Sequence, residues 1–228
     1  MKISRLFDVS DRTVVITGGS RGIGEMIARA YVENGARVIL TSRKASDVEG
    51  LAAELGAAAT AIPADLSQMA EIDRFVSEVA RQTPRVDILF NNAGASWGAA
   101  FDDFPESGWD KVMSINLKAV FFLTQRMIGL LEAAVTDDWH ARVINIGSID
   151  GQHVSDLETY SYAASKAGVL HLTRMMAKFL AGRGVLVNAI APGFFHSRMT
   201  AGIAEEFTDR MREETPMKRW GQPADMAG

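Results

Sequence analysis

Residues 13–24 read TVVITGGSRGIG, and this stretch decides the fold. Its first five residues are apolar or β-branched, as in a buried strand, and glycines then recur at positions 18, 19, 22 and 24. Glycine suits a tight turn from a strand into a helix, where a Cβ would hold a phosphate away from the helix N-terminus. The spacing differs from the common GxGxxG. The stretch nevertheless predicts a strand, a dinucleotide-binding loop and a helix.

Further strand-like runs follow, separated by segments of helix length. They are short and nearly continuously apolar, and they cover residues 37–42, 59–63, 86–91, 142–147 and 185–191. Residues 69–82 have the apolar spacing of an amphipathic helix, with Ser67 placed to cap it. This alternation predicts an α/β fold of Rossmann type, a doubly wound parallel sheet with helices on both faces. No repeat or linker divides the chain, so residues 1–228 are expected to form a single domain.

Composition excludes several classes of protein. The 228 residues are 47% hydrophobic and 23% charged, as in an ordinary globular protein. No apolar run has the length of a membrane span or the core of a signal peptide, so we expect a cytoplasmic protein. There is no cysteine, the four histidines are scattered, and no metal site is predicted. The net charge of −4, without a basic run, argues against nucleic acid or a membrane as partner and favours a small molecule.

Charge at the end of the second strand indicates which dinucleotide binds. An acidic residue at this place would bind the ribose 2′-hydroxyl of NAD, but the sequence reads Ser42-Arg43-Lys44. A guanidinium pairs with a 2′-phosphate, which a carboxylate would repel, and Arg21 in the glycine loop offers a second cation. NADP(H) is therefore the expected cofactor. The alternative is that Arg43 and Lys44 are only solvated charges.

Two further segments carry residues suited to carbonyl chemistry. Tyr162 and Lys166 are four residues apart, so on a helix they lie on one side, and a nearby cation lowers the pKa of a phenol. The pair could act as a general acid. Ser148 closes the fifth strand, at the edge where open sheets bind ligands, and could bond a substrate carbonyl. Taken singly, each could be an ordinary helix-surface pair or a turn residue.

These motifs together resemble the short-chain dehydrogenases/reductases, from about Val9 to the last residue. The matching segments are Thr17 to Gly24, Asn91 to Gly94, Asn116 in SINL, Ser148, Tyr162 to Lys166, and Pro192-Gly193. The resemblance is closest to the NADPH-dependent 3-oxoacyl carrier-protein reductases, in the branch linked with rhamnolipid synthesis. It implies that Asn116, Ser148, Tyr162 and Lys166 are the catalytic residues. In that scheme Tyr162 protonates the carbonyl oxygen, Ser148 orients the carbonyl, Lys166 lowers the tyrosine pKa and binds ribose, and Asn116 holds a water.

The loop, the strand end and the resemblance together place a set of residues at the cofactor. These are Gly18, Ser20, Arg21, Gly22, Ile23, Gly24, Arg43, Asp65, Leu66, Asn92, Ala93, Gly94, Tyr162, Lys166, Pro192, Gly193, Phe195 and Ser197. The resemblance also implies that Asp65 and Leu66 contact adenine and that Ser197 bonds the carboxamide.

The sequence departs from the resemblance in two respects. Arg183 matches one of two basic residues that grip an acidic carrier protein, but Trp139 stands in place of the other. A carrier protein as partner is therefore doubtful. The sequence also ends at Gly228, where the family continues into a helix and a last strand, so the predicted sheet lacks that C-terminal edge strand.

Apolar side chains recur after Pro192-Gly193 and suggest a substrate lid at about residues 194–219. The stripe consists of Phe195, Met199, Ile203, Phe207 and Met211, and Trp97 is expected to face the same cleft. Such a cleft favours an acyl chain or another apolar ketone, although the stripe could serve only to pack the lid.

The expected function is NADPH-dependent reduction of a carbonyl, such as a 3-oxoacyl thioester or an apolar ketone, to an alcohol. The alternatives are an alcohol or sugar dehydrogenase of the same family and a non-catalytic NADP-binding sensor. Residues 108–136 and 159–183 are long segments that are apolar over more than one face, which predicts a homo-oligomer unless these faces are simply core.

Overall fold

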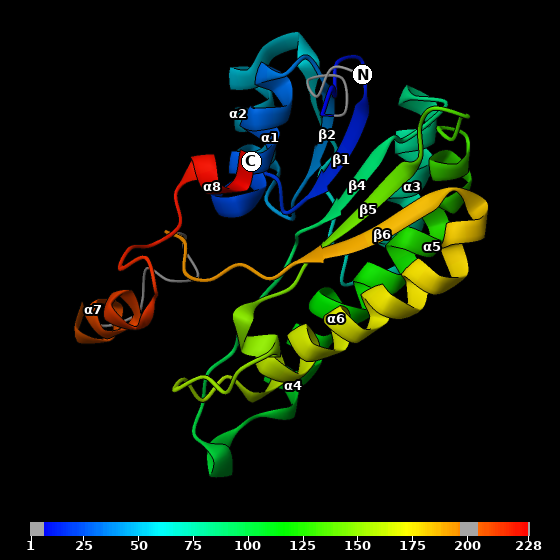
Figure 1. Ribbon diagram of the computed structural model, residues 1–228. Helices are drawn as coiled ribbons and strands as arrows, with labels where there is room; N and C mark the ends of the chain where they lie inside the picture. Colours follow the sequence, from blue (N-terminus) through cyan, green and yellow to red (C-terminus); the bar gives the residue numbers. More distant parts are fainter. Residues whose placement is uncertain (1–6, 197–204, 228) are drawn as a thin grey trace.

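The computed structural model describes residues 7–196 and 205–227, which are built around one parallel sheet (Figure 1). The strands are β1 (Thr13–Thr17), β2 (Arg37–Thr41), β3 (Ala59–Ala61), β4 (Ile88–Asn91), β5 (Ala141–Ile146) and β6 (Val185–Ile190). They pair in the order β3-β2-β1-β4-β5-β6, every pair parallel. The predicted α/β fold is confirmed, and β6 is an edge of this sheet.

Helices follow the strands and cover both faces of the sheet. They are α1 (Gly22–Glu33), α2 (Ala45–Leu55), α3 (Met69–Gln82), α4 (Glu106–Met113), α5 (Ala119–Glu132), α6 (Tyr160–Leu180), α7 (Glu205–Glu214) and α8 (Pro223–Ala227). In the part of the chain that the structure describes, no helix combines the length and the apolar character needed to cross a membrane.

The core has two layers because side chains of a strand point alternately to opposite faces. Val14 and Ile16 of β1 are buried with residues of α1 and α2, whereas Val15 is buried with residues of α3, α5 and α6. All three valine and isoleucine side chains are fully buried. Burial on both faces explains why the strands read as continuous apolar runs instead of alternating ones.

The long apolar segment of residues 108–136 is not a regular α-helix throughout. Between α4 and α5 the chain forms a π-helical segment, Ser114–Lys118, with Asn116 buried at its centre. Such single wide turns inside helices occur often at functional sites. The predicted cap of α3 is also wrong, because the Ser67 hydroxyl donates to the Asp65 carboxylate at 2.8 Å and Gln68 precedes the helix.

The described part of the expected lid contains α7 and the segment that leads out of β6. Phe195 is buried and forms an isolated β-bridge with Gly221. A Cβ added to Gly221 would lie 2.3 Å from the Phe195 ring, so only glycine fits here. Met211 of α7 is also buried. Ser197, Met199 and Ile203 lie outside the described residues, as does the Phe207 side chain, so the apolar stripe stays a prediction.

Candidate active site

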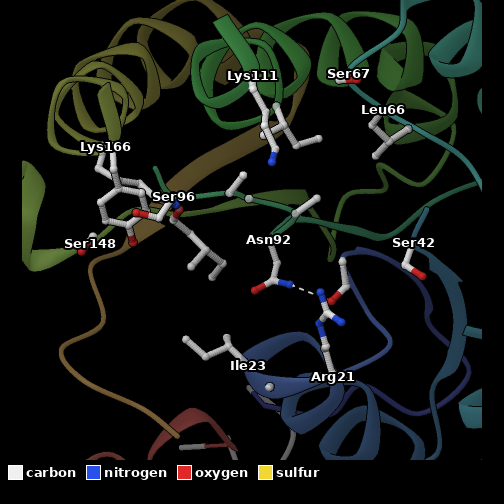
Figure 2. A pocket seen from close by; sticks show the side chains of 18 of the residues that line it. Arg21, Ile23, Ser42, Leu66, Ser67, Asn92, Ser96, Lys111, Ser148 and Lys166 are labelled. Atoms are coloured by element: carbon white, nitrogen blue, oxygen red, sulfur yellow. Dashed lines mark hydrogen bonds between the residues drawn. The ribbon is translucent and has the colours of Figure 1, made fainter. Parts of the chain in front are cut away.

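A cleft of about 1310 Å³ lies along the carboxyl ends of the strands. It spans the point where the strand order reverses, between β1 and β4, which is where open α/β sheets bind ligands. Figure 2 shows Ser148 and Lys166 at one end of the pocket, Ser42 and Leu66 at the other, and Asn92 between them. The cleft is therefore long enough to hold a ligand of two parts. Ser148 and Lys166, which are expected to be catalytic, lie at only one of its ends.

The glycine loop after β1 has the backbone that the sequence predicts. Gly18 and Gly22 have positive φ angles of 62° and 55°, which side chains rarely adopt. A Cβ on Gly24 would lie 2.3 Å from the Gly18 carbonyl oxygen, so only glycine lets the helix approach the loop this closely. Gly18, Gly22 and Ser20 line the cleft at the N-terminus of α1. This cradle fits the pyrophosphate of a dinucleotide.

Hydrogen bonds join the loop after β1 to the loop after β4. The Thr17 hydroxyl accepts from the amides of Asn92 and Ala93, both at 2.9 Å. In return, the Asn92 side chain donates to the carbonyl oxygens of Thr17 at 2.8 Å and Gly18 at 3.1 Å. The two loops that would flank the cofactor are therefore held at a fixed separation.

Basic side chains gather where β2 ends. Arg21, Arg43 and Lys44 all line the cleft and are exposed. Lys44 pairs with Asp47 at 2.7 Å, and Arg21 lies 3.8 Å from the same carboxylate. Arg43 forms no ion pair with any residue of the described ranges. These three cations suit the binding of a 2′-phosphate. Two of them, Arg21 and Lys44, are held close together by Asp47.

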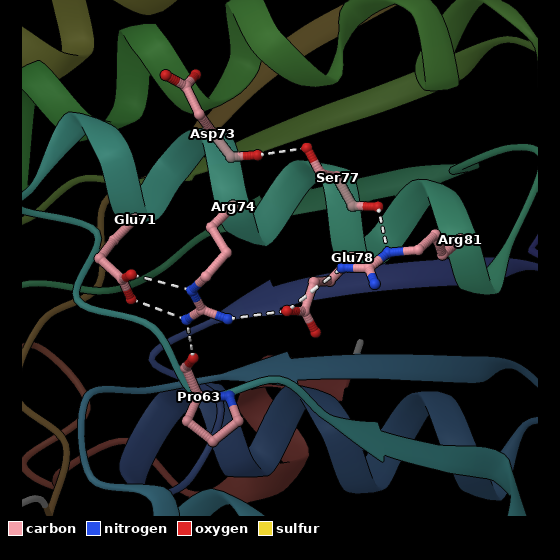
Figure 3. Close-up of polar contacts among 7 residues, drawn as sticks. All are labelled: Pro63, Glu71, Asp73, Arg74, Ser77, Glu78 and Arg81. Carbon is pink, nitrogen blue, oxygen red and sulfur yellow. Dashed lines mark hydrogen bonds and ion pairs between the residues drawn. The ribbon is translucent and has the colours of Figure 1, made fainter.

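The loop after β3 forms the wall that would contact adenine. Asp65 and Leu66 line the cleft, and Asp65 also accepts from the Ser67 amide at 3.1 Å. Arg74 of α3 holds this loop from behind by donating to the Pro63 carbonyl oxygen at 2.6 Å (Figure 3). Arg74 also pairs with Glu71 at 2.8 Å, which lowers the pKa of that carboxyl.

Ser148, Tyr162 and Lys166 come together at the other end of the cleft. Burial raises the pKa of the Tyr162 phenol, and its contact with the Ser148 hydroxyl acts in the opposite direction. The cation expected to lower this pKa is turned aside, since the Lys166 ammonium donates to the Ile146 carbonyl oxygen at 2.6 Å and lies 5.5 Å from the centre of the tyrosine ring. Burial therefore favours the protonated form of the Tyr162 phenol.

Lys166 itself is almost fully buried, at 5% exposure. Burial lowers its pKa from 10.5 to about 8. Between these two values the unfolded chain binds more protons than the folded one, so the free energy of unfolding rises with pH across this window. Below pH 8 the burial cost is fully present, and the shift corresponds to about 3 kcal/mol.

Replacing Lys166 by Met is therefore expected to flatten the pH dependence of stability between about pH 8 and 10.5. The measurement is urea unfolding of the ligand-free protein at several pH values in this window. Lys178→Met, an exposed lysine of the same helix, serves as control and should keep the wild-type slope. An unchanged slope in Lys166→Met would mean that the buried group does not titrate there.

Asn116 does not line the cleft but supports it from behind. Its side-chain oxygen accepts from the Ala95 amide at 2.8 Å, and its side-chain nitrogen donates to the Ala95 carbonyl at 2.9 Å and to the Ser165 hydroxyl at 2.9 Å. The π-helical turn turns this side chain into the protein. Asn116 thus ties the loop after β4 to α6, the helix that carries Tyr162 and Lys166.

The structure brings nearly all of the expected site residues to one cleft. Those that line it are Gly18, Ser20, Arg21, Gly22, Ile23, Arg43, Asp65, Leu66, Asn92, Ala93, Gly94, Ser148, Tyr162, Lys166, Pro192, Gly193 and Phe195. Gly24 and Asn116 pack behind the lining, and Ser197 lies outside the described residues. Within the described ranges no three His, Asp or Glu side chains form a group that could hold a metal ion.

Other lining residues were not expected from the sequence. Ser42, Ser96 and Asp150 each follow the end of a strand, and this position alone could have identified them. Lys111 lies on α4 and carried no sequence signal. Trp97 is not among the lining residues.

The Trp97 ring packs instead where a Cβ on Gly108 would lie 2.7 Å from it. The prediction that Trp97 faces the cleft is therefore wrong, because its indole ring packs against Gly108 of α4.

Trp139 and Arg183 are the two positions at which the resemblance implies residues that bind a carrier protein. They lie in different surroundings. Trp139 is buried, at 9% exposure, between the guanidinium groups of Arg12 and Arg142, whose carbons lie 3.6 and 3.9 Å from the ring centre. Arg183 is exposed but pairs with Glu132 at 2.6 Å. Neither position offers a free cation to an acidic partner.

Comparison with known proteins agrees with this geometry. The family model described as short chain dehydrogenase matches residues 12–207. The rhamnolipids biosynthesis 3-oxoacyl-[acyl-carrier-protein] reductase of Pseudomonas aeruginosa is 44% identical over 97% of this chain and 88% of that protein. The structure of the RhlG/NADP active-site complex from the same organism superposes with a TM-score of 0.93, at 44% identity, over 97% of this chain and 88% of that one.

A gluconate 5-dehydrogenase from Burkholderia cenocepacia, solved in complex with NADP and tartrate, is also similar. It superposes with a TM-score of 0.89 at 31% identity, over 97% of this chain and 87% of that one. With the glycine cradle, the serine, tyrosine and lysine of the cleft and the matched family model together, this chain belongs to the short-chain dehydrogenase family.

Proposed function

We propose that this protein reduces a ketone carbonyl to an alcohol with NADPH. The observation that carries the proposal is that Ser148, Tyr162 and Lys166 line the same cleft as the glycine cradle, and that exposed cations lie at the opposite end. A dinucleotide laid along the cleft would place its 2′-phosphate near Arg43 and its reactive ring near Tyr162. A purely NADP-binding sensor has no use for Ser148 and Tyr162 beside the reactive end.

Each polar group at the reactive end has a defined task in this reaction. The bound cofactor supplies the hydride. The hydroxyls of Ser148 and Tyr162 hold the carbonyl oxygen, and Tyr162 donates its proton to that oxygen as the alcohol forms. Lys166, whose pKa is about 8, keeps a positive charge near neutral pH at 5.5 Å from the centre of the Tyr162 ring, where it favours the phenolate that remains. Asn116 acts as a positioning residue through the loop after β4 and through Ser165.

A 3-oxoacyl thioester is the first candidate substrate, on the strength of the similarity to the rhamnolipid reductase. Ile149, Leu157, Phe194 and Phe195 give the reactive end apolar walls. Each methylene buried there should contribute up to about 0.8 kcal/mol. We therefore expect kcat/KM for NADPH-dependent reduction of 3-oxoacyl thioesters to rise severalfold per carbon until the cleft is full.

The measurement is the rate of NADPH oxidation with thioesters of increasing chain length. A flat dependence would contradict an acyl-binding cleft. If no 3-oxoacyl thioester and no simple ketone is reduced at all, the proposed function itself is wrong.

A ketone that carries hydroxyl groups is the second candidate. The observation that favours it is Asp150, a half-buried carboxylate in the lining of the reactive end. An apolar chain offers this group no hydrogen bond, whereas a hydroxyl does. The similar gluconate 5-dehydrogenase is named for a polyhydroxylated substrate.

We also propose that the protein is at least a dimer. Phe121 of α5 is 39% exposed, and Met175 and Phe179 of α6 are 45% and 65% exposed. Such exposed apolar side chains on two long helices indicate a contact surface. Light scattering at micromolar concentration should give at least twice the mass of one chain, and Phe179→Glu should lower it. A monomeric wild type would contradict the prediction.

A further inference from the structure

Asp150 lies in the turn that follows the proposed catalytic serine. The chain forms one 3₁₀ turn at Ile149–Gly151, and the Asp150 amide donates to the Ser148 hydroxyl at 3.2 Å. The turn is fixed on two sides, since the Ile149 amide donates to the Pro192 carbonyl at 3.2 Å. On the other side, a Cβ on Gly151 would lie 2.7 Å from the carbonyl carbon of Lys166. The position of Asp150 is therefore well defined.

Asp150 lies at the reactive end of the cleft. It lines the cleft together with Ser148 and Tyr162. Its charge is close enough to Tyr162 to raise the pKa of the phenol. Asp150 is thus within reach of a molecule whose carbonyl oxygen is held by Ser148 and Tyr162.

The carboxylate has no partner of its own among the residues described. No hydrogen bond or ion pair of the side chain joins it to another residue of these ranges, and burial raises its pKa. The buried ammonium of Lys166 donates its hydrogen bond to the Ile146 carbonyl oxygen instead. A half-buried carboxylate without a partner lowers stability, so its presence in a cleft points to a donor on the ligand.

We propose that Asp150 is a specificity-determining residue for the ketone reduction proposed above. Its carboxylate accepts a hydrogen bond from a hydroxyl group on a carbon next to the reacting carbonyl. Of the two substrate classes named above, Asp150 therefore favours the hydroxyketone over the plain ketone. An apolar group at the same place would leave the carboxylate desolvated and without a hydrogen bond. Asp150 therefore favours binding of a ketone with the hydroxyl and disfavours binding of a ketone without it.

The test compares two ketones of nearly equal size, 1-hydroxy-2-butanone and 3-pentanone, in which a methyl group replaces the hydroxyl. With NADPH, the wild-type protein should show kcat/KM about 10- to 100-fold higher for the hydroxyketone, the usual effect of a hydrogen bond to a charged group. In Asp150→Leu, which keeps the size of the side chain, the ratio should fall to about 1. The ratio is the readout because loss of the charge near Tyr162 affects both ketones alike.

Two further variants separate recognition from general effects. Asp150→Asn retains an acceptor oxygen and should keep part of the preference. Asp110→Leu removes a carboxylate of α4 that also lines the cleft and should leave the wild-type ratio unchanged.

Three results would overturn the inference. The first is a wild type without preference for the hydroxyketone, and the second is an unchanged ratio in Asp150→Leu. The third is a loss of NADPH affinity in Asp150→Leu with the ratio preserved, because Asp150 would then bind the cofactor. In all three the proposed ketone reduction stands as long as the wild type oxidises NADPH with 3-oxoacyl thioesters or simple ketones.

Discussion

Tyr162→Phe is expected to lower kcat for ketone reduction by about 100- to 10,000-fold, the usual contribution of a general acid. The phenyl ring fills the same space, but it has no proton to give to the carbonyl oxygen. Among the groups that line the reactive end, the Ser148 hydroxyl cannot replace it, because an alcohol is a far weaker acid than a phenol. The dissociation constant for NADPH should change little, since the glycine cradle and the basic end are untouched.

Tyr160→Phe is the matched control for this experiment. Tyr160 begins the same helix but is 37% exposed, and its hydroxyl donates to Glu158 at 2.8 Å outside the reactive end. Its loss should leave kcat near the wild-type value. If Tyr162→Phe retains more than about a tenth of the activity, Tyr162 is not the proton donor.

Much of the fold could be predicted because its strands are buried on both faces. Runs such as residues 13–17 and 37–41 consist of apolar and β-branched residues apart from Arg37, and this pattern follows from burial on both faces. The π-helical turn around Asn116 could not be predicted. The turn is stabilised by three hydrogen bonds between the Asn116 side chain and Ala95 and Ser165. These residues are far apart in the sequence, so local helix preference does not reveal the turn.

The same distinction holds for the site. Residues at the ends of strands, such as Ser148 and Arg43, could be placed because parallel strands all end at one edge. The direction of the Lys166 ammonium could not, since it depends on the Ile146 carbonyl oxygen, which belongs to a strand 20 residues away in the sequence. Trp97 was misplaced for a related reason, because the surface that receives it exists only where Gly108 lacks a side chain.

Arg43→Asp is expected to remove most of the preference for NADPH over NADH. Arg43 lines the cleft at the end of β2 and has no ion pair within the described ranges, so its guanidinium is available to a 2′-phosphate. A charge-assisted contact of this kind contributes about 1.5 to 3 kcal/mol, roughly a 10- to 100-fold difference in affinity. An aspartate would add repulsion of the phosphate and offer an acceptor to the 2′-hydroxyl of NADH. The two dissociation constants, measured by fluorescence titration, should therefore converge or reverse.

Arg21 provides a smaller part of the same preference, because Asp47 lies 3.8 Å from its guanidinium and partly neutralises it. Arg21→Ala should therefore weaken NADPH binding less than Arg43→Asp does. Arg37→Asp, at the opposite end of β2, makes the same charge change away from the cleft and should leave the preference as in the wild type. Equal affinities of the wild-type protein for NADPH and NADH would show that the cations at the end of β2 are only solvated charges, and the cofactor assignment would then lose its physical basis.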